Sequence, residues 1–177
     1  KIKARDGISP DLAKVVVRRS NSLIATLMVK MGDADGMICG VIGRYDFHLE
    51  HIRDVIGVRE GAHGLAALNA LILDNHNLFI ADTFVNEDPT AEQLADIAAM
   101  AVEEVQRFGL PPRVPFLSHS MFGSSSRPSA RKMREARDLF VARMPHIPAD
   151  GEMQGDAALS EAVRNKLLPG STLDGSA

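Results

Sequence analysis

The strongest constraint on the fold is the segment 90–108, which carries a complete set of helix signals. Thr90 and Gln93 have the spacing of a capping box, in which each side chain accepts a hydrogen bond from the other residue's backbone N–H. Apolar residues then recur every three or four positions, as on one face of an α-helix. The run Gly109-Leu110-Pro111-Pro112 follows and ends the pattern. The sequence therefore predicts a helix that packs one face on a core.

Weaker signals on both sides of this helix predict alternating helices and strands. We expect further helices over residues 10–19, 22–31, 47–56, 128–144 and 155–168, and strands over 37–42, 65–73, 78–83, 114–118 and 148–153. The polar quartet 74–77 between two apolar runs predicts an antiparallel hairpin. We therefore predict an α/β fold, a three-layer α/β/α domain with a mixed sheet, and treat 1–177 as a single domain.

Composition narrows the class of protein. The chain has 20 Lys+Arg against 23 Asp+Glu, so its net charge of −3 excludes a bulk electrostatic hold on nucleic acid or anionic membrane. No apolar run approaches the roughly 18 residues of a membrane span, and the N-terminus carries no secretory signal. We expect a cytoplasmic protein with no nucleic-acid or membrane partner. Its single cysteine, Cys39, lies in an apolar run and is predicted to be a buried structural thiol, with a reactive cysteine as the alternative.

The segment 117–128 has the highest content of chemically useful groups. It joins a predicted strand to a basic helix, whose free N–H groups and dipole favour an anion at its start. Ligand sites in α/β sheets also favour this end of a strand. No Walker A motif is present, and a capped helix with a solvated basic face is the alternative. The candidate anion-binding residues are Ser118, Ser120, Gly123, Ser124, Ser125, Ser126, Arg127 and Arg131.

Three other polar features suggest chemistry less specifically. His119 stands between two serines, but neighbours on a strand point to opposite faces, so no local triad is expected. His48 and His51 have a metal-binding spacing without a third ligand, which favours a partly exposed pair. Asp156, in a polar block over 150–158, is either a ligand-binding acid or the N-cap of a helix. We assign no catalytic residue and no metal ligand.

Several blocks, in this order, resemble the phosphate acetyl/butyryltransferases. They are residues 28–37, residues 86–98 with Asp88-Pro89-Thr90-Ala91, the loop 117–128, residues 150–158, and Pro169-Gly170-Ser171. The resemblance implies an α/β fold related to the isocitrate and isopropylmalate dehydrogenases, a homodimer or higher homo-oligomer, and acyl transfer between coenzyme A and phosphate in a cleft between two domains.

Departures from this family pattern point to a subfamily. Phe47-His48-Leu49-Glu50 stands where acetyltransferases have Thr-Leu/Val-Arg-Pro, and the catalytic Asp-Leu-Ser-Arg-Gly motif would lie beyond Ala177. Gly43-Arg44-Tyr45 and Ser118-His119-Ser120 resemble the C-terminal domain of large bacterial NADP-dependent malic enzymes. Because the chain begins at Lys1 rather than Met, we expect it to be a piece of such a protein, without the N-terminal malic enzyme domain.

The malic enzyme resemblance implies a regulatory role. Such domains bind acetyl-CoA as an allosteric effector and support oligomerisation, while NADP and a divalent Mg or Mn ion serve oxidative decarboxylation of malate elsewhere in the parent enzyme. The fragment itself would need no cofactor. Arg44 and Asp156 join the loop residues as candidate effector-binding groups. The alternatives are a fragment of an active phosphate acetyltransferase and a dimerisation module with a vestigial cleft.

Overall fold

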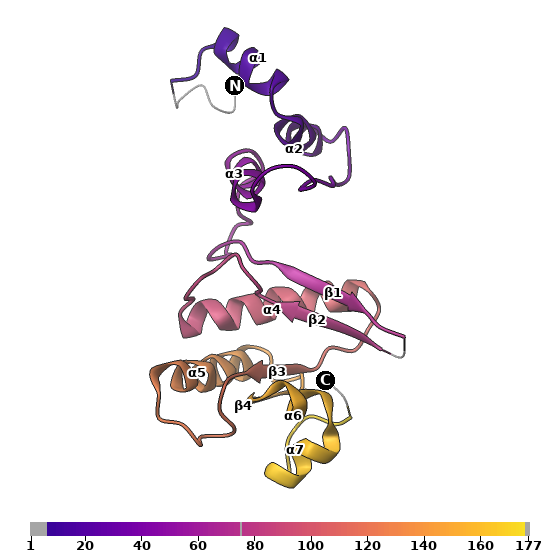
Figure 1. Ribbon diagram of the computed structural model, residues 1–177, viewed down its shortest axis with the longest axis vertical. Helices are drawn as coiled ribbons and strands as arrows, with labels where there is room; N and C mark the ends of the chain where they lie inside the picture. Colours follow the sequence, from indigo (N-terminus) through magenta and orange to yellow (C-terminus); the bar gives the residue numbers. More distant parts are fainter. Residues whose placement is uncertain (1–6, 75, 176–177) are drawn as a thin grey trace. The chain divides into compact units, whose positions relative to one another are not determined.

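The structure is a computed structural model that describes residues 7–74 and 76–175. The chain divides into two compact units, Lys1–Gly61 and Ala62–Ala177 (Figure 1). The single domain over 1–177 stays a prediction.

The first unit contains three helices, close to the predicted ranges: α1 (Pro10–Arg18), α2 (Asn21–Met31) and α3 (Tyr45–Val55). Serine hydroxyls cap α1 and α2, because Ser9 and Ser20 each accept a hydrogen bond from a backbone N–H in the first turn. Gly32 ends α2 in the left-handed region at φ 80°, which a glycine adopts without strain. Local end signals thus set these helices.

The predicted strand over residues 37–42 is wrong. This segment is irregular, and the side chains of Ile38, Val41 and Ile42 are 98%, 95% and 86% exposed. Cys39 is exposed as well, so its prediction as a buried thiol is also corrected. The apolar run indicated burial, but a strand needs a partner to pair with, and the described residues of this unit include no other strand.

The two histidines of α3 are structural contacts of the first unit. The ring of His48 bonds the Ser22 hydroxyl at 2.7 Å and the Ile42 carbonyl oxygen at 3.0 Å, and His51 bonds the Ser20 hydroxyl at 3.1 Å. His48 is buried, which corrects the expectation that both are partly exposed, because α2 packs over it. These bonds join α3 to α2.

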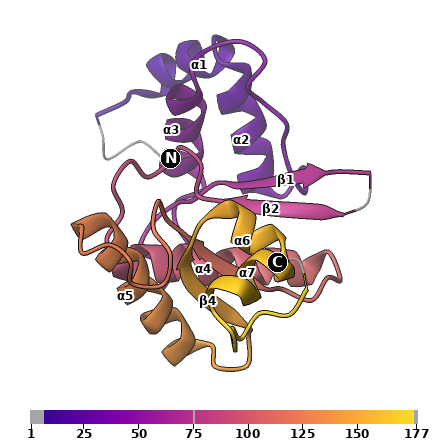
Figure 2. The same ribbon diagram turned by 60° about the horizontal axis from the view of Figure 1, so that its bottom comes forward.

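The second unit contains two separate two-stranded sheets. Strands β1 (Leu68–Ile72) and β2 (Asn77–Ala81) form the predicted antiparallel hairpin (Figure 2). Strands β3 (Val114–Leu117) and β4 (Ala149–Met153) pair in parallel (Figure 1). The prediction of one mixed sheet is therefore wrong for the described residues, since no strand of one pair bonds to the other pair. Turn and crossover signals in the sequence indicate which strands pair with each other, but not whether two such pairs join into one sheet.

Four helices complete this unit: α4 (Ala91–Arg107), α5 (Pro128–Arg143), α6 (Gly155–Leu159) and α7 (Glu161–Leu167). The capping box at Thr90 and Gln93 is confirmed. The single helix predicted over 155–168 is two helices, because Ser160 has an extended backbone and caps α7. None of the helices within 7–74 and 76–175 is long and apolar enough to cross a membrane.

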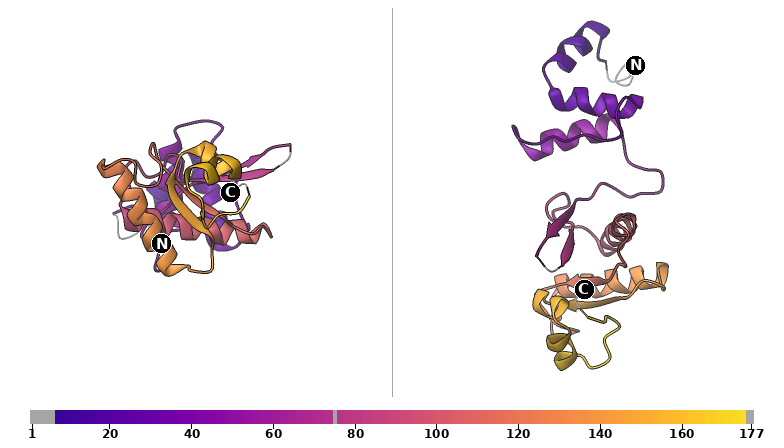
Figure 3. Two further views of the ribbon diagram at one scale, coloured as in Figure 1. Left: turned by 90° about the horizontal axis from the view of Figure 1, so that it is seen from below. Right: turned by 90° about the vertical axis from the view of Figure 1, so that its right-hand side faces the viewer.

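The core of the second unit lies where α4 and α5 meet β3 and β4. Helix α4 packs against both β2 and α5 (Figures 1 and 3). Small residues on α4 and α5 let the two helices approach, and the Phe116 and Phe140 rings lie 5.7 Å apart between them and the strands. The buried members are Ala91, Ala95, Ala98, Val102, Phe116, Ala136, Phe140, Ile147 and Ala149. This core holds the ends of β3, β4 and α5, which carry the candidate site.

Candidate functional site

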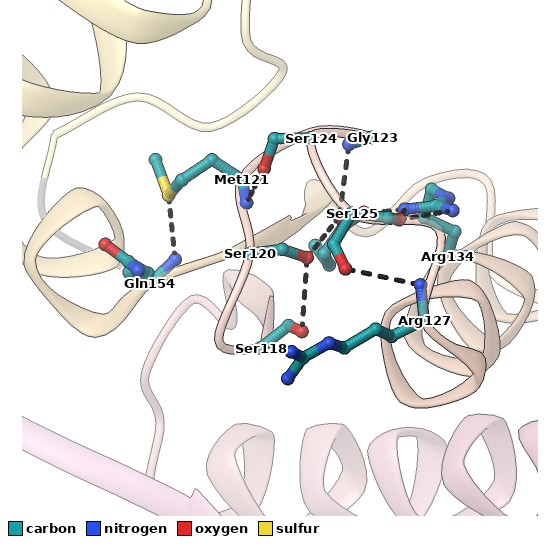
Figure 4. A network of polar contacts seen from close by, with 10 residues as sticks. Ser118, Ser120, Met121, Gly123, Ser124, Ser125, Arg127, Arg134 and Gln154 are labelled. Carbon is teal, nitrogen blue, oxygen red and sulfur yellow. Dashed lines mark hydrogen bonds and ion pairs between the residues drawn. The ribbon is translucent and has the colours of Figure 1, made fainter.

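Residues 118–127, here called the serine loop, connect β3 to the start of α5 (Figure 4). Two backbone hydrogen bonds tie this loop to the neighbouring strand β4: Ser118 N–H donates to Met153 O and Phe122 N–H donates to Glu152 O, both at 2.8 Å. The predicted position of the loop, after a strand and before a basic helix, is therefore confirmed.

Glu152 is the residue around which the loop is organised. Phe116 pairs with Gly151 and Leu117 pairs with Met153, so Glu152 is the extra residue of a register shift between the two strands. Such irregularities turn a side chain away from its regular direction. The Glu152 carboxylate is fully buried, and its Oε1 accepts hydrogen bonds from Ser120 Oγ at 2.7 Å and Gly123 N at 3.1 Å.

Arg134, on the second turn of α5, supplies the positive charge for this carboxylate. Its Nη1 donates to Glu152 Oε1 at 2.9 Å, and both terminal nitrogens donate to Ser125 O at 3.2 Å. Burial alone would raise the pKa of Glu152, but the hydrogen bonds from Ser120, Gly123 and Arg134 outweigh it and hold that pKa below its ordinary value. Glu152 is therefore an ionised, internal anion under the loop.

The outer side of the loop presents the remaining predicted groups. Gly123, Ser124, Ser126 and Arg127 are exposed, and Arg131 is exposed one turn into α5. Helix α5 starts without a side-chain cap on its first N–H groups. In the view of Figure 4 the Arg127 side chain extends toward the Ser118 end of the loop. Hydroxyls, guanidinium groups and the positive end of the helix dipole together can bind an anion with several oxygens.

The inner side of the loop is different, since its donors are already used. Ser120 is buried, and its hydroxyl donates a hydrogen bond to Glu152. Gly123 is exposed, but its N–H also donates to the buried Glu152 carboxylate. Ser124 Oγ accepts from Met121 N at 3.0 Å and Ser125 Oγ accepts from Arg127 N at 3.3 Å, which shapes the turn. The eight loop and α5 candidates thus lie together but divide into an inner and an outer set.

The other two predicted residues, Asp156 and Arg44, make local contacts of their own. Asp156 lies in the first turn of α6 and accepts a hydrogen bond from Ala157 N at 2.8 Å; the N-cap is Gln154, so the prediction of Asp156 as N-cap is wrong. Arg44 belongs to the first unit, where it precedes α3 and forms an exposed ion pair with Asp46. The hydrogen bond between them lowers the pKa of Asp46 and raises that of Arg44.

Sequence reasoning missed Glu152 and Arg134 as partners. In the sequence, Arg134 is one of several charges on a basic helix, and Glu152 is one of several acids in the 150–158 block. Eighteen residues separate them, and only the pairing of β3 with β4 brings the two together.

A second buried acid in β4 holds the C-terminal part of the described chain. Asp150 accepts hydrogen bonds from Ser171 Oγ at 2.7 Å and Thr172 N at 3.2 Å. The Pro169-Gly170-Ser171 motif is therefore tied to the strand that carries Glu152. Among residues 7–74 and 76–175, no group of three or more His, Cys, Asp or Glu could hold a metal ion.

Comparisons with known proteins agree on one family. Residues 1–177 match the family described as phosphate acetyl/butaryl transferase. The chain is 50% identical over 173 residues to an NADP-dependent malic enzyme of Haemophilus influenzae, covering 98% of this chain and 23% of that protein. It is 34% identical over 175 residues to a phosphate acetyltransferase of Nitratidesulfovibrio vulgaris, covering 99% and 25%. The chain thus spans about a quarter of the length of these curated relatives.

A solved structure extends the likeness to three dimensions. The phosphotransacetylase from Streptococcus pyogenes superposes with a TM-score of 0.85 at 29% identity, covering 99% of this chain and 54% of that one. The fold is that of a small α/β protein with helices and short sheets, like a phosphotransacetylase.

Proposed function

Because the chain belongs to the phosphate acetyl/butyryl transferase family, we propose that it is the regulatory and oligomer-forming part of an NADP-dependent malic enzyme. In this proposal it binds acetyl-CoA as an allosteric effector and transfers no acetyl group. The parent enzyme would convert malate to pyruvate with NADP and a Mg or Mn ion held in another domain, and the chain would form a homodimer or higher homo-oligomer. The relation of the fold to isocitrate dehydrogenases remains a prediction.

The observation that carries the proposal is the exposed outer side of the serine loop. Coenzyme A brings several phosphate charges, and the Ser124 and Ser126 hydroxyls with Arg127 and Arg131 offer donors of matching chemistry. The start of α5 adds the positive end of a helix dipole. A polyanionic nucleotide is the ligand class that these groups fit.

Two further observations support binding without acyl transfer. Leu49 stands where the resemblance places an arginine of working acetyltransferases, so that position carries no positive charge. On the serine loop, the inner donors that could stabilise a developing negative charge already bond Glu152. Electrostatic stabilisation of that charge is the main source of catalysis in acyl transfer. Regulation then requires acetyl-CoA to bind one state of the enzyme more tightly than another.

Isothermal titration of acetyl-CoA into the complete protein tests the proposal. Arg127→Ala is expected to raise the Kd by about tenfold, the loss of one charge-assisted hydrogen bond, while Arg113→Ala, an exposed arginine before β3, leaves it unchanged. An equal effect of both substitutions would remove the loop from the site, and no binding by the wild type would overturn the proposed function.

An active phosphate acetyltransferase is the second candidate. The 34% identity to the Nitratidesulfovibrio enzyme and the superposition on a phosphotransacetylase favour it. An assay for acetyl-CoA formation from acetyl phosphate and coenzyme A separates the two. The regulatory proposal expects no turnover by the complete protein, and a measurable rate that is lost on Arg127→Ala would favour the transferase.

A further inference from the structure

We propose that Glu152 is a positioning residue: its buried carboxylate holds the serine loop in the shape in which the outer hydroxyls and Arg127 bind a polyanion. The identity of that polyanion rests on the proposed function, whereas the role of Glu152 rests on contacts within the second unit. Glu152 would touch no ligand and would act through the loop.

The first support is the distribution of its hydrogen bonds. One oxygen, Oε1, accepts from Ser120, Gly123 and Arg134, which come from two places in the loop and from α5. Arg134 also donates hydrogen bonds to the Ser125 carbonyl oxygen. The Glu152–Arg134 pair therefore fixes the loop at both sides of its turn.

The second support is the state of the other carboxylate oxygen of Glu152. Glu152 Oε2 is buried and has no hydrogen-bond partner among the described residues. A buried acceptor without a partner lowers stability, and buried ion pairs are seldom the most stable choice for an interior position. Glu152 keeps this destabilising arrangement while its other carboxylate oxygen bonds the loop. This favours a role for Glu152 in holding the shape of the loop.

The third support is the backbone of the turn. Phe122 has a positive φ of 41°, which is uncommon for a residue with a side chain, and Gly123 follows at φ 89°. The Phe122 N–H bonds the backbone oxygen of Glu152, and the Gly123 N–H bonds its side chain. Two adjacent amides thus report separately on the backbone and on the carboxylate of the same residue.

Residue-resolved hydrogen exchange of the complete protein uses this pair of amides. In Glu152→Ala the Gly123 amide should exchange about tenfold faster relative to Phe122, because a hydrogen bond to a charged group is lost. Glu152→Gln keeps an acceptor and should raise the ratio less, by about threefold. Glu135→Gln, which changes an exposed glutamate next to Arg134 on α5, is the matched control and should leave the ratio unchanged.

Titration of acetyl-CoA into the same variants completes the test. Positioning predicts that the Kd rises about tenfold in Glu152→Ala, is partly rescued in Glu152→Gln and is unchanged in Glu135→Gln. Equal acceleration of both amides, or an altered exchange ratio with an unaltered Kd, would reduce Glu152 to a structural residue and overturn the inference.

Two further outcomes stay informative. If Glu152→Ala does not fold, Glu152→Gln decides alone, and an exchange ratio equal to that of the wild type contradicts the inference. If wild-type protein binds no acetyl-CoA, the proposed function fails, while the exchange ratio still decides whether Glu152 holds the loop.

Discussion

The two units of the chain are stabilised in different ways. In the second unit, α4, α5, β3 and β4 enclose a core of nine buried apolar residues and a buried carboxylate that is fully bonded on one oxygen. In the first unit, the buried residues of the helices are Thr26, His48 and Val55, and helix caps and histidine–serine bonds make the contacts. Many large apolar side chains of its helices are exposed.

This difference separates helix formation, which depends on nearby residues, from core formation, which depends on residues distant in the sequence. Caps and helical periodicity are local and form helices wherever they occur, so both units show them. Burial depends on partners distant in the sequence, which the second unit supplies from its own residues. The candidate site lies on the unit with the core, where a loop can be held in one geometry.

The largest expected effect compares a core phenylalanine with an exposed one. Phe140→Ala removes a fully buried ring beside Phe116 and should lower the free energy of unfolding by about 3–5 kcal/mol. Phe47→Ala, on α3, removes a half-exposed ring that contacts His48 and His51 and should cost about 1 kcal/mol. Denaturant unfolding of both variants measures the two losses in the free energy of unfolding. Equal losses would show that the first unit is as well packed as the second.

An intermediate effect is expected from two glycines near Glu152. A Cβ on Gly151 would lie 2.6 Å from Phe116 O, at a φ of 136°, so Gly151→Ala should cost about 2–4 kcal/mol from overpacking and backbone strain. Gly123→Ala meets no atom within 4 Å and should cost about 1–2 kcal/mol, from its φ of 89° alone. Thermal unfolding compares them, and a smaller loss for Gly151→Ala would contradict the close pairing of β3 and β4.

The smallest expected effect concerns pH. The pKa of Glu152 is lowered in the folded state, so its contribution to stability is complete above the unfolded pKa of about 4.3 and is lost as pH falls through the folded pKa. Glu152→Gln should cost about 1.5–3 kcal/mol at pH 7, the strength of hydrogen bonds to a charged group. The variant should also lose less stability than wild type on acidification. Unfolding curves from pH 7 to pH 3 check this, and parallel losses would contradict an ionised Glu152.

The features that the sequence predicts correctly are local ones. Thr90 and Gln93 mark a helix start through their side chains, and the polar run at 74–77 marks the hairpin, because each signal acts within a few residues. The serine loop is also found this way, from its place between strand and helix. The strand at 37–42 and the single mixed sheet fail because pairing partners are not encoded nearby.

The inner half of the site needed the structure. Glu152 reaches the loop only because it is the extra residue where β3 and β4 shift register, and no spacing in the sequence signals that shift. In the sequence, Arg134 is one positive charge on a predicted helix. Its partner becomes evident only in the structure, where α5 packs on β3 and β4. Arg44, placed with the site by resemblance alone, belongs to the other unit.

A crystal structure of the complete protein with bound acetyl-CoA tests the central claim most directly. We expect phosphate oxygens within hydrogen-bond distance of Ser124, Ser126 or Arg127, with the Glu152 carboxylate still bonded to Ser120 and Gly123. Phosphates bound away from the serine loop, or a phosphate in the place of the Glu152 carboxylate, would contradict it.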